Sequence, residues 1–272
     1  MIQDIYPSKL NTEYFPYEMT DKDILVSFNR EGEVLLGKKG DTPLFPKLAV
    51  TDDEKIIYLF SVDDDRYFLL LDDANYPEDG AEYYSLRSLR RHFTGKEVFA
   101  IFTAYHLWKW YTDNVFCGKC GEKLVFDQTE RALRCAKCGN VVYPRINPAV
   151  IVGVLKGDTI LVTRYKTGYN YNALVAGFTE IGETLEETVA REVMEETGVK
   201  VKNIRYYKSQ PWGIAQDVLV GFFCEADGDG EIHMDENELK FAQWVTRDEL
   251  ELQPDNISLT NEMMMLFKDG RL

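Results

Sequence analysis

The fold of this chain is decided by residues 177–199, which read Gly177-Phe-Thr-Glu-Ile-Gly-Glu-Thr-Leu-Glu-Glu-Thr-Val-Ala-Arg-Glu-Val-Met-Glu-Glu-Thr-Gly-Val199. The pattern predicts a loop that leads into a short helix. Thr184 is suited to cap the start of this helix, and Glu187 three residues later completes a capping box. Gly198 is suited to end the helix, because glycine accepts a left-handed backbone without strain.

The predicted helix places carboxylates next to its apolar face. At about 100° per residue, the apolar stripe is formed by Leu185, Val189 and Val193. Glu192 and Glu196 fall beside that stripe and Glu195 at its edge, whereas a solvated acidic helix would place its glutamates opposite the stripe. A carboxylate that is buried against a packed face raises the free energy of the folded state unless its charge is compensated. Because Mg²⁺ and Mn²⁺ take oxygen ligands of this kind, the stretch predicts a divalent-metal site.

Composition sets limits on the function. The chain has 272 residues, with 31 Lys and Arg against 46 Asp and Glu, a formal charge of −15. Such length allows one to three domains, and such an acidic surface argues against a general nucleic-acid binder. The three histidines argue against a histidine-dependent triad. No apolar run is long enough for a membrane helix and no signal peptide is visible, so we expect a cytoplasmic protein without membrane partners.

Four cysteines stand in two pairs of the form Cys-x-x-Cys. Cys117 and Cys120 are followed, after 14 residues, by Cys135 and Cys138, and a glycine comes after each pair. With short strand-like segments between the pairs, this spacing predicts a Cys₄ zinc ribbon, against a disulfide framework or a redox site as alternatives. Four thiolates leave no open position, so the zinc is expected to be structural. Cys224 lies in an apolar run and is expected in the core.

The remaining sequence predicts mainly strands. Residues 1–113 are expected to form a β-rich unit with hairpins around 30–32 and 63–65, closed by a helix over 98–111 whose aromatic residues are core. Strands are expected at 55–62, 66–71, 149–155, 160–164, 172–176, 203–208, 218–225 and 241–245, with Ser209–Trp212 as a connection and a final helix at about 258–268. Alternating strands with one acidic and one terminal helix predict a mixed sheet between helices.

Residues 177–199 resemble, position for position, the signature of the Nudix hydrolases. The ribbon, Tyr143-Pro-Arg145 and Ser209-Gln-Pro-Trp212 occur in the order and spacing of the NADH pyrophosphatase branch of that family, and the similarity is strong from Arg87 to Trp244. The resemblance implies an α+β fold, namely a catalytic Nudix α/β/α sandwich with a mixed sheet at 145–272. A Cys₄ zinc ribbon at 114–144 and a degenerate, β-rich Nudix-like domain at 1–113 would precede it.

The same resemblance implies a reaction. Members of the branch use Mg²⁺ or Mn²⁺ to hydrolyse the diphosphate bond of NAD(H) to AMP and nicotinamide mononucleotide, and some remove NAD caps from RNA. RNA is therefore expected only as an NAD-capped substrate. The family is dimeric and shares residues across its interface, so a homodimer is expected. The alternatives are a Nudix hydrolase of ADP-ribose, FAD or a dinucleoside polyphosphate, and a non-catalytic nucleotide sensor, which would have degenerate glutamates.

Site residues follow from the resemblance, position by position. The metal ligands would be the Ala176 carbonyl, Glu192, Glu196 and Glu238, and the catalytic set would include Glu183, Arg191 and Glu195. Either Glu195 or Glu238 would be the general base for water attacking phosphorus. The residues implied to contact substrate are Arg87, Glu130, Tyr143, Phe178, Gln210, Pro211 and Trp212, with Phe178 stacking on a ring of the dinucleotide.

One departure from the family pattern concerns specificity. The chain has Gly213-Ile214-Ala215 where the family has Pro-Phe-Pro, and Asp217 where the family has serine. Because glycine has the widest backbone freedom, we interpret the loop as one that costs more to order on binding. Asp217 would repel phosphates, or hydrogen-bond a ribose if turned inward. A weaker preference for NAD(H) than the family norm is expected.

Overall fold

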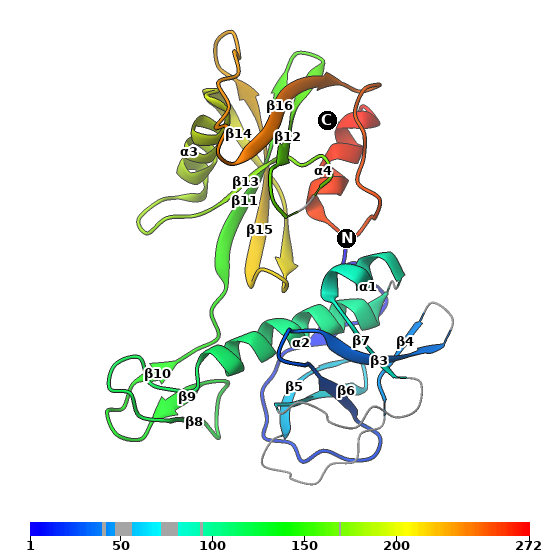
Figure 1. Ribbon diagram of the computed structural model, residues 1–272, viewed down its shortest axis with the longest axis vertical. Coiled ribbons are helices and arrows are strands. Elements are labelled where there is room, and N and C mark those ends of the chain that lie inside the picture. The colour runs from blue at the N-terminus through cyan, green and yellow to red at the C-terminus, as the bar shows by residue number, and fades with distance from the viewer. Residues whose placement is uncertain (40–41, 47–55, 72–80, 93–94, 169) are drawn as a thin grey trace. The chain divides into compact units, whose positions relative to one another are not determined.

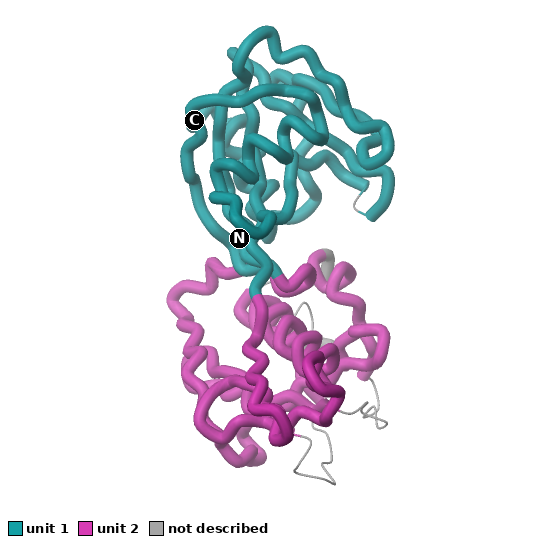
Figure 2. Tube along the Cα trace, turned by 90° about the vertical axis from the view of Figure 1, so that its left-hand side faces the viewer, with its two compact units in different colours: residues 1, 146–211, 217–272 teal, residues 2–145, 212–216 magenta. Residues whose placement is uncertain are grey.

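A computed structural model describes residues 1–39, 42–46, 56–71, 81–92, 95–168 and 170–272 (Figure 1). The chain divides into two compact units (Figure 2). Unit 1 consists of Met1, residues 146–211 and residues 217–272, and unit 2 of residues 2–145 and 212–216. Among the described helices, none is long and apolar enough to cross a membrane.

Unit 1 is built on a six-stranded sheet. Its strands run in the order β14 (Val201–Trp212), β15 (Asp217–Ala226), β11 (Asn147–Lys156), β12 (Thr159–Tyr165) and β16 (Leu239–Thr246), and β13 (Val175–Phe178) pairs with β11. β11 and β15 are parallel, whereas β11 is antiparallel to β12 and β13, and β12 to β16. The predicted mixed sheet is therefore confirmed. Residues 209–212, expected as a connection, instead continue β14.

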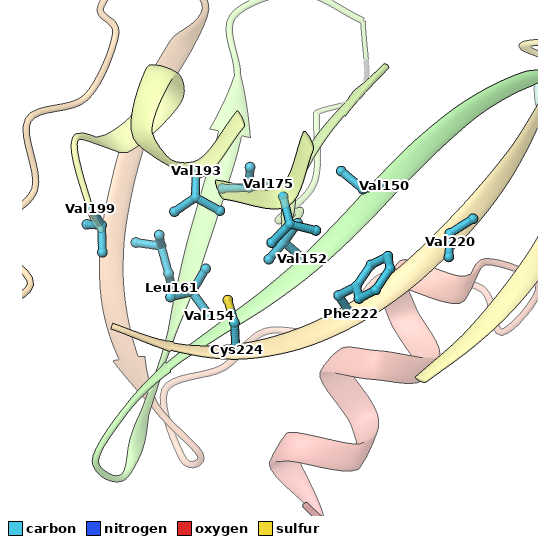
Figure 3. Close-up of a cluster of buried hydrophobic side chains, with 11 residues drawn as sticks. Val150, Val152, Val154, Leu161, Val175, Val193, Val199, Val220, Phe222 and Cys224 are labelled. Atoms are coloured by element: carbon cyan, nitrogen blue, oxygen red, sulfur yellow. The ribbon is translucent and has the colours of Figure 1, made fainter. Parts of the chain in front are cut away.

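Two helices cover the sheet of unit 1. Helix α3 (Leu185–Thr197) packs on β11 and β13, and α4 (Leu259–Lys268) packs on β11 and β15. The core beneath α3 consists of Val150, Val152, Val154, Leu161, Val175, Val189, Val193, Val199, Val220, Phe222 and Cys224, with α4 on the other side of the sheet (Figure 3). This is the predicted helix–sheet–helix sandwich, and Cys224 lies in the core as expected.

Helix α3 begins and ends where the sequence predicts. The Glu187 backbone N–H donates to Thr184 Oγ1 (3.2 Å), and the Thr184 N–H donates to the Glu187 carboxylate (2.7 Å), so the capping box is formed. Gly198 ends the helix with φ of 71°. Val189 and Val193 are fully buried. Local signals thus fix the helix that carries the glutamates.

Among its described residues, the N-terminal part of unit 2 contains two small sheets and two helices. One sheet has the order β1 (Leu10–Asn11), β5 (Ile56–Val62), β6 (Asp65–Leu70), β2 (Ile24–Ser27), and the other β4 (Thr42–Leu44), β3 (Val34–Lys39), β7 (Glu82–Tyr84). Helix α1 (Leu86–His92) precedes α2 (Lys96–Asp113). The aromatic residues of α2 are mostly buried, so the prediction that they are core is confirmed.

The two hairpins predicted in this region differ in outcome. β5 and β6 pair antiparallel around 63–65, as expected, although Lys55 at the predicted start lies outside the described residues. The turn predicted around 30–32 is formed, since the Asn29 N–H donates to the Glu33 carbonyl (2.9 Å) and the Gly32 N–H to the Asn29 carbonyl (2.9 Å). The predicted pairing of its flanking strands is wrong, because β2 pairs in parallel with β6 and β3 pairs with β4 and β7. Next to the turn, Phe28 and Val34 form an isolated antiparallel bridge.

The ribbon segment of unit 2 has a sheet of its own. Its strands are β8 (Leu124–Phe126), β9 (Leu133–Cys135) and β10 (Val141–Val142), all antiparallel, in the order β10-β9-β8. The short strands expected between the cysteine pairs are therefore present.

Candidate active site

Arg191 on α3 fixes the loop that precedes the helix. Its guanidinium donates two hydrogen bonds to Glu183, with Nε at 2.6 Å and Nη2 at 2.9 Å. It also donates to Glu192 (2.8 Å), to Glu195 (3.0 Å) and to the Phe178 carbonyl (2.9 Å). The two-point contact with Arg191 lowers the pKa of Glu183 to about 2. Because such pairs are geometrically specific, Arg191 ties both ends of the loop to the helix.

The carboxylate of Glu192 lies directly against Gly177. A Cβ atom at position 177 would lie 1.9 Å from the Glu192 Cδ, so a larger residue is incompatible with this position of Glu192. The side chain of Glu192 is only 14% exposed. Burial raises the pKa of Glu192, and its hydrogen bond to Arg191 opposes the shift. Glycine at the end of β13 thus creates the space that the carboxylate occupies.

Glu196 is buried beside the backbone carbonyl of Ala176. The residue is 3% exposed, and its two carboxylate oxygens lie 3.0 and 3.3 Å from the Tyr165 hydroxyl. That hydroxyl also lies 3.4 Å from the Ala176 carbonyl oxygen. Burial raises the pKa of Glu196 to about 8, and the charges of Glu192 and Glu238 contribute. No lysine, arginine or histidine of the described ranges forms a salt bridge with this buried acid.

These oxygen donors fit a divalent cation in their chemistry. Glu192, Glu196 and the Ala176 carbonyl supply hard ligands of the kind that Mg²⁺ and Mn²⁺ bind, and a cation would compensate the buried charge. Glu238 is exposed just before β16, near enough to raise the pKa of both other glutamates. The carboxylates do not converge on one point as the cysteines do, so a shared ion at these donors stays a prediction.

The four ribbon cysteines do converge. The sulfur atoms lie within 4.8 Å of one another, with Cys117 to Cys138 at 3.7 Å and Cys120 to Cys135 at 3.4 Å. Tetrahedral zinc with bonds of about 2.3 Å separates its sulfurs by about 3.8 Å, so the group fits zinc. A backbone hydrogen bond from Lys119 lowers the pKa of Cys117 and one from Cys138 lowers that of Cys135, whereas the contact with the Cys135 sulfur raises the pKa of Cys120.

Each cysteine pair sits on the same kind of turn. The Gly121 N–H donates to the Cys117 carbonyl (2.8 Å), and the Gly139 N–H donates to the Cys135 carbonyl (2.9 Å). Both glycines have positive φ, 76° and 72°, where a side chain would be strained. The glycine after each pair therefore has a backbone reason, and the two turns present their sulfurs to one centre.

Several residues predicted to contact substrate lie in unit 2. The Tyr143 hydroxyl donates to Glu130 (3.0 Å), which also accepts from Arg134 (2.7 Å). The ring of Tyr143 is more than half exposed. Arg87 is exposed on α1. The structure thus joins Tyr143 to Glu130 on the ribbon, whereas the glutamates of the 177–199 stretch belong to unit 1.

Residues 210–212 have different environments. Gln210 is 0% exposed, and its side chain donates to the Ile257 carbonyl (2.8 Å) and accepts from the Leu259 N–H (2.8 Å). Its amide therefore holds the start of α4 in this structure. Pro211 is exposed. Trp212 belongs to unit 2, where Phe102 lies 5.6 Å from it, centroid to centroid.

Phe178 is the predicted contact that lies beside the glutamates. Its side chain is more than half exposed, while its carbonyl is bound by Arg191. Tyr165, by contrast, was not identified from the sequence. A single tyrosine at the end of a strand has no spacing pattern, and its partners Ala176 and Glu196 are distant in the chain.

Comparisons with known proteins agree with this architecture. The NUDIX domain family matches residues 145–266, and the NADH pyrophosphatase zinc ribbon domain matches residues 113–143. Curated relatives include the NAD-capped RNA hydrolase NudC of Citrobacter koseri, 45% identical over 149 residues, and that of Escherichia coli O1:K1 / APEC, 44% identical over 149 residues. Each match covers 54% of this chain and 57% of the relative, so the chain matches little more than half the length of these curated relatives.

A solved structure supports the fold. The crystal structure of a NUDIX hydrolase from Nitrosomonas europaea superimposes with a TM-score of 0.50 at 21% identity, over 57% of this chain and 92% of that one. At this identity the likeness concerns the fold alone. Together with this likeness of fold, the family matches show a NUDIX domain at residues 145–266, preceded by an NADH pyrophosphatase zinc ribbon domain at residues 113–143.

Proposed function

We propose that this protein is an enzyme that hydrolyses the diphosphate bond of NAD(H) to AMP and nicotinamide mononucleotide. The observation that carries the proposal is the buried Glu196, which has no salt-bridge partner among the described residues and lies beside Glu192 and the Ala176 carbonyl, behind a loop that Arg191 holds. The zinc ribbon and the relatives named NAD-capped RNA hydrolase support NAD(H) and NAD-capped RNA as substrates.

The chain's own residues have separable roles in this reaction. Glu192, Glu196 and the Ala176 carbonyl would hold Mg²⁺ or Mn²⁺, with Glu238 as a further ligand. When bound, the ions neutralise phosphate oxygens and acidify the attacking water. Glu195 is an exposed carboxylate of α3 and contacts Arg191. A carboxylate oxygen of Glu195 or Glu238 would accept the proton of that water.

Substrate contacts extend the site beyond the glutamates. Phe178 offers an exposed ring to the adenine or the nicotinamide, since aromatic faces stack on bases. Further contacts are proposed for Arg87, Glu130, Tyr143, Gln210, Pro211 and Trp212. The side-chain amide of Gln210 is already bonded to Ile257 and Leu259, so in this conformation only its backbone could contact substrate. The proposed domains are 1–113, 114–144 and 145–272, the first a degenerate Nudix-like domain, and a cytoplasmic location suits a capped-RNA substrate.

A screen of diphosphate compounds tests the activity. The purified protein is incubated with NADH, NAD⁺, ADP-ribose or FAD and Mg²⁺ or Mn²⁺, and the products are separated by chromatography. AMP and nicotinamide mononucleotide are expected from NAD(H), and a Glu196→Gln variant should form neither at a comparable rate. Turnover of only ADP-ribose or FAD would favour the alternative hydrolase, and binding without turnover of any compound would favour a sensor.

A homodimer that shares its sites is a separate part of the proposal. It is supported by the exposed Tyr143 ring and its hydrogen bond to Glu130 on the ribbon. If these residues complete the neighbouring subunit's pocket, heterodimers of a Glu196→Gln chain with a Tyr143→Ala chain should recover part of the activity. Verified heterodimers with no recovery, or an active monomer, would contradict the shared site.

A further inference from the structure

The hydroxyl of Tyr165 lies between two groups that come from different elements. It is 3.0 and 3.3 Å from the carboxylate oxygens of Glu196 on α3, and 3.4 Å from the carbonyl oxygen of Ala176 on β13. A tyrosine hydroxyl has one hydrogen to donate, so it can serve only one acceptor at a time. The shorter distance favours donation to Glu196, and so would the charge that its carboxylate carries when a cation is bound.

The backbone next to Tyr165 reaches the third predicted carboxylate ligand. The Lys166 N–H donates to the Glu238 carbonyl (2.9 Å), and the Lys166 ammonium donates to the Glu236 carbonyl. The register between β12 and β16 shifts between Arg164 and Tyr165. The irregular end of β12 therefore contacts Glu196 through a side chain and the Glu238 segment through the backbone.

From this geometry we propose that Tyr165 is a positioning residue for the divalent-metal site, one that holds the Glu196 carboxylate next to the Ala176 carbonyl. Glu196 is 3% exposed, so water cannot replace the hydroxyl easily, and a carboxylate without that donor would adopt other rotamers. Groups that orient metal ligands in this way commonly contribute 10–100-fold to metal affinity. The inference rests on the metal ligands named in the proposed function, and on no particular substrate.

A Mn²⁺ titration of Tyr165→Phe tests the inference without turnover. The protein is freed of divalent ions by gel filtration, since a chelator would also remove ribbon zinc, and free Mn²⁺ is followed by electron paramagnetic resonance. Because the ring stays and only the hydroxyl is lost, we expect Mn²⁺ binding weaker by about tenfold or more, with unchanged zinc content. Circular dichroism checks the fold, and Tyr165→His, which keeps a ring donor, should recover part of the loss.

Tyr207 offers a matched control in the same unit. Its hydroxyl donates to Glu262 (2.6 Å), at the opposite helix α4. Tyr207→Phe removes the same kind of tyrosine–glutamate hydrogen bond, and should leave Mn²⁺ affinity unchanged. If both variants weaken binding equally, the effect of Tyr165 is a general loss of stability and the inference is wrong.

If Tyr165 acts through Glu196, the effects of the two substitutions on Mn²⁺ affinity should not be additive. In a Glu196→Gln background, which already binds Mn²⁺ weakly, adding Tyr165→Phe should change the affinity by less than twofold. Full additivity, or parental affinity in Tyr165→Phe, would overturn the positioning role while leaving the proposed function standing. Failure of the parent protein itself to bind Mn²⁺ would instead remove the metal site, and with it the proposed function.

Discussion

Replacing Asp217 with asparagine should change how stability depends on pH. Asp217 begins β15, opposite Asn147 in the parallel pair, and is 4% exposed. Its Oδ1 has no hydrogen-bond partner within the described part of the chain. Burial raises the pKa of Asp217 from 3.8 to about 7. The side chain is therefore turned inward, and the sequence-based alternative of an acid facing phosphates does not hold for this conformation.

The size of the effect follows from the two pKa values. Between the unfolded value and about 7, the folded state binds the Asp217 proton more tightly, so stability falls as pH rises, by up to about 1.4 kcal/mol per unit. From about pH 5.5 to above the folded pKa, this amounts to about 2 kcal/mol. The asparagine variant lacks this dependence. The unpaired amide of the asparagine lowers the stability of the variant by about 1–3 kcal/mol. Because this loss is the same at both pH values, it does not affect the change in stability between them.

Urea unfolding followed by circular dichroism measures the change. The free energy of unfolding of variant and parent is compared at about pH 5.5 and about pH 8.5, above the pI and in the presence of zinc. The variant should gain about 2 kcal/mol relative to the parent at the higher pH. The exposed residue Asp229, changed to asparagine, provides the control and should show no such gain. A variant-to-parent difference that is the same at both pH values would refute the buried, protonated Asp217.

Three further predictions concern the zinc ribbon and the proposed divalent-metal site. Glu196→Gln should lower kcat by about 10² with little loss of stability, because a metal ligand is removed; near-parental turnover in steady-state assays would contradict its role. Cys135→Ser should lose the single zinc per chain in elemental analysis and should unfold more readily, since structural zinc contributes to folding free energy; active, zinc-free parent protein would refute this. Gly177→Ala should displace the Glu192 carboxylate and weaken Mn²⁺ binding at least tenfold. Gly118→Ala is the control, because a Cβ at that position meets open space, and it should leave Mn²⁺ binding unchanged. Equal Mn²⁺ affinity in the two variants would show that Glu192 can move without loss of binding.

Local signals explain why the helix that carries Glu192 and Glu196 was predictable. The capping box joins Thr184 to Glu187, three residues apart, at the start of the helix. At its other end, the N–H of the left-handed Gly198 donates to the Met194 carbonyl, four residues back. The periodicity of the valines places Glu196 toward the core, and the structure shows it buried. The cysteine pairs were predictable for the same reason, because their turns are short-range. Each of these features needs no knowledge of the rest of the fold.

Long-range pairing explains what the sequence missed. Tyr165 meets Glu196 across 31 residues, and nothing near it in the chain indicates that contact. The strand pair β2 and β6 is parallel and joins residues 24–27 to 67–70, so the turn residues at 30–32 indicated a turn correctly but not the strand with which β2 pairs. The hydrogen bonds of Gln210 to Ile257 and Leu259 depend likewise on the position of α4. Such contacts follow from the tertiary fold.

Gly213 shows how the same residue can have two physical explanations. From the sequence, its backbone freedom suggested a loop that is costly to order. In unit 2, however, a Cβ at Gly213 would lie 2.1 Å from the Phe102 carbonyl oxygen of α2, and 2.8 Å from the carbonyl carbon. Both are backbone atoms of a helix, so no side-chain rotation relieves the contact.

The turn at Gly213 is also closed by its own hydrogen bonds. The Ala215 N–H donates to the Trp212 carbonyl (3.2 Å), and the Gln216 N–H donates to the Gly213 carbonyl (3.2 Å). A proline at 213, as in the family pattern, would place ring atoms where the α2 backbone lies. Glycine here is therefore a consequence of close packing, and restoring Pro-Phe-Pro would force the turn away from α2 before it could preorganise the loop for a ligand.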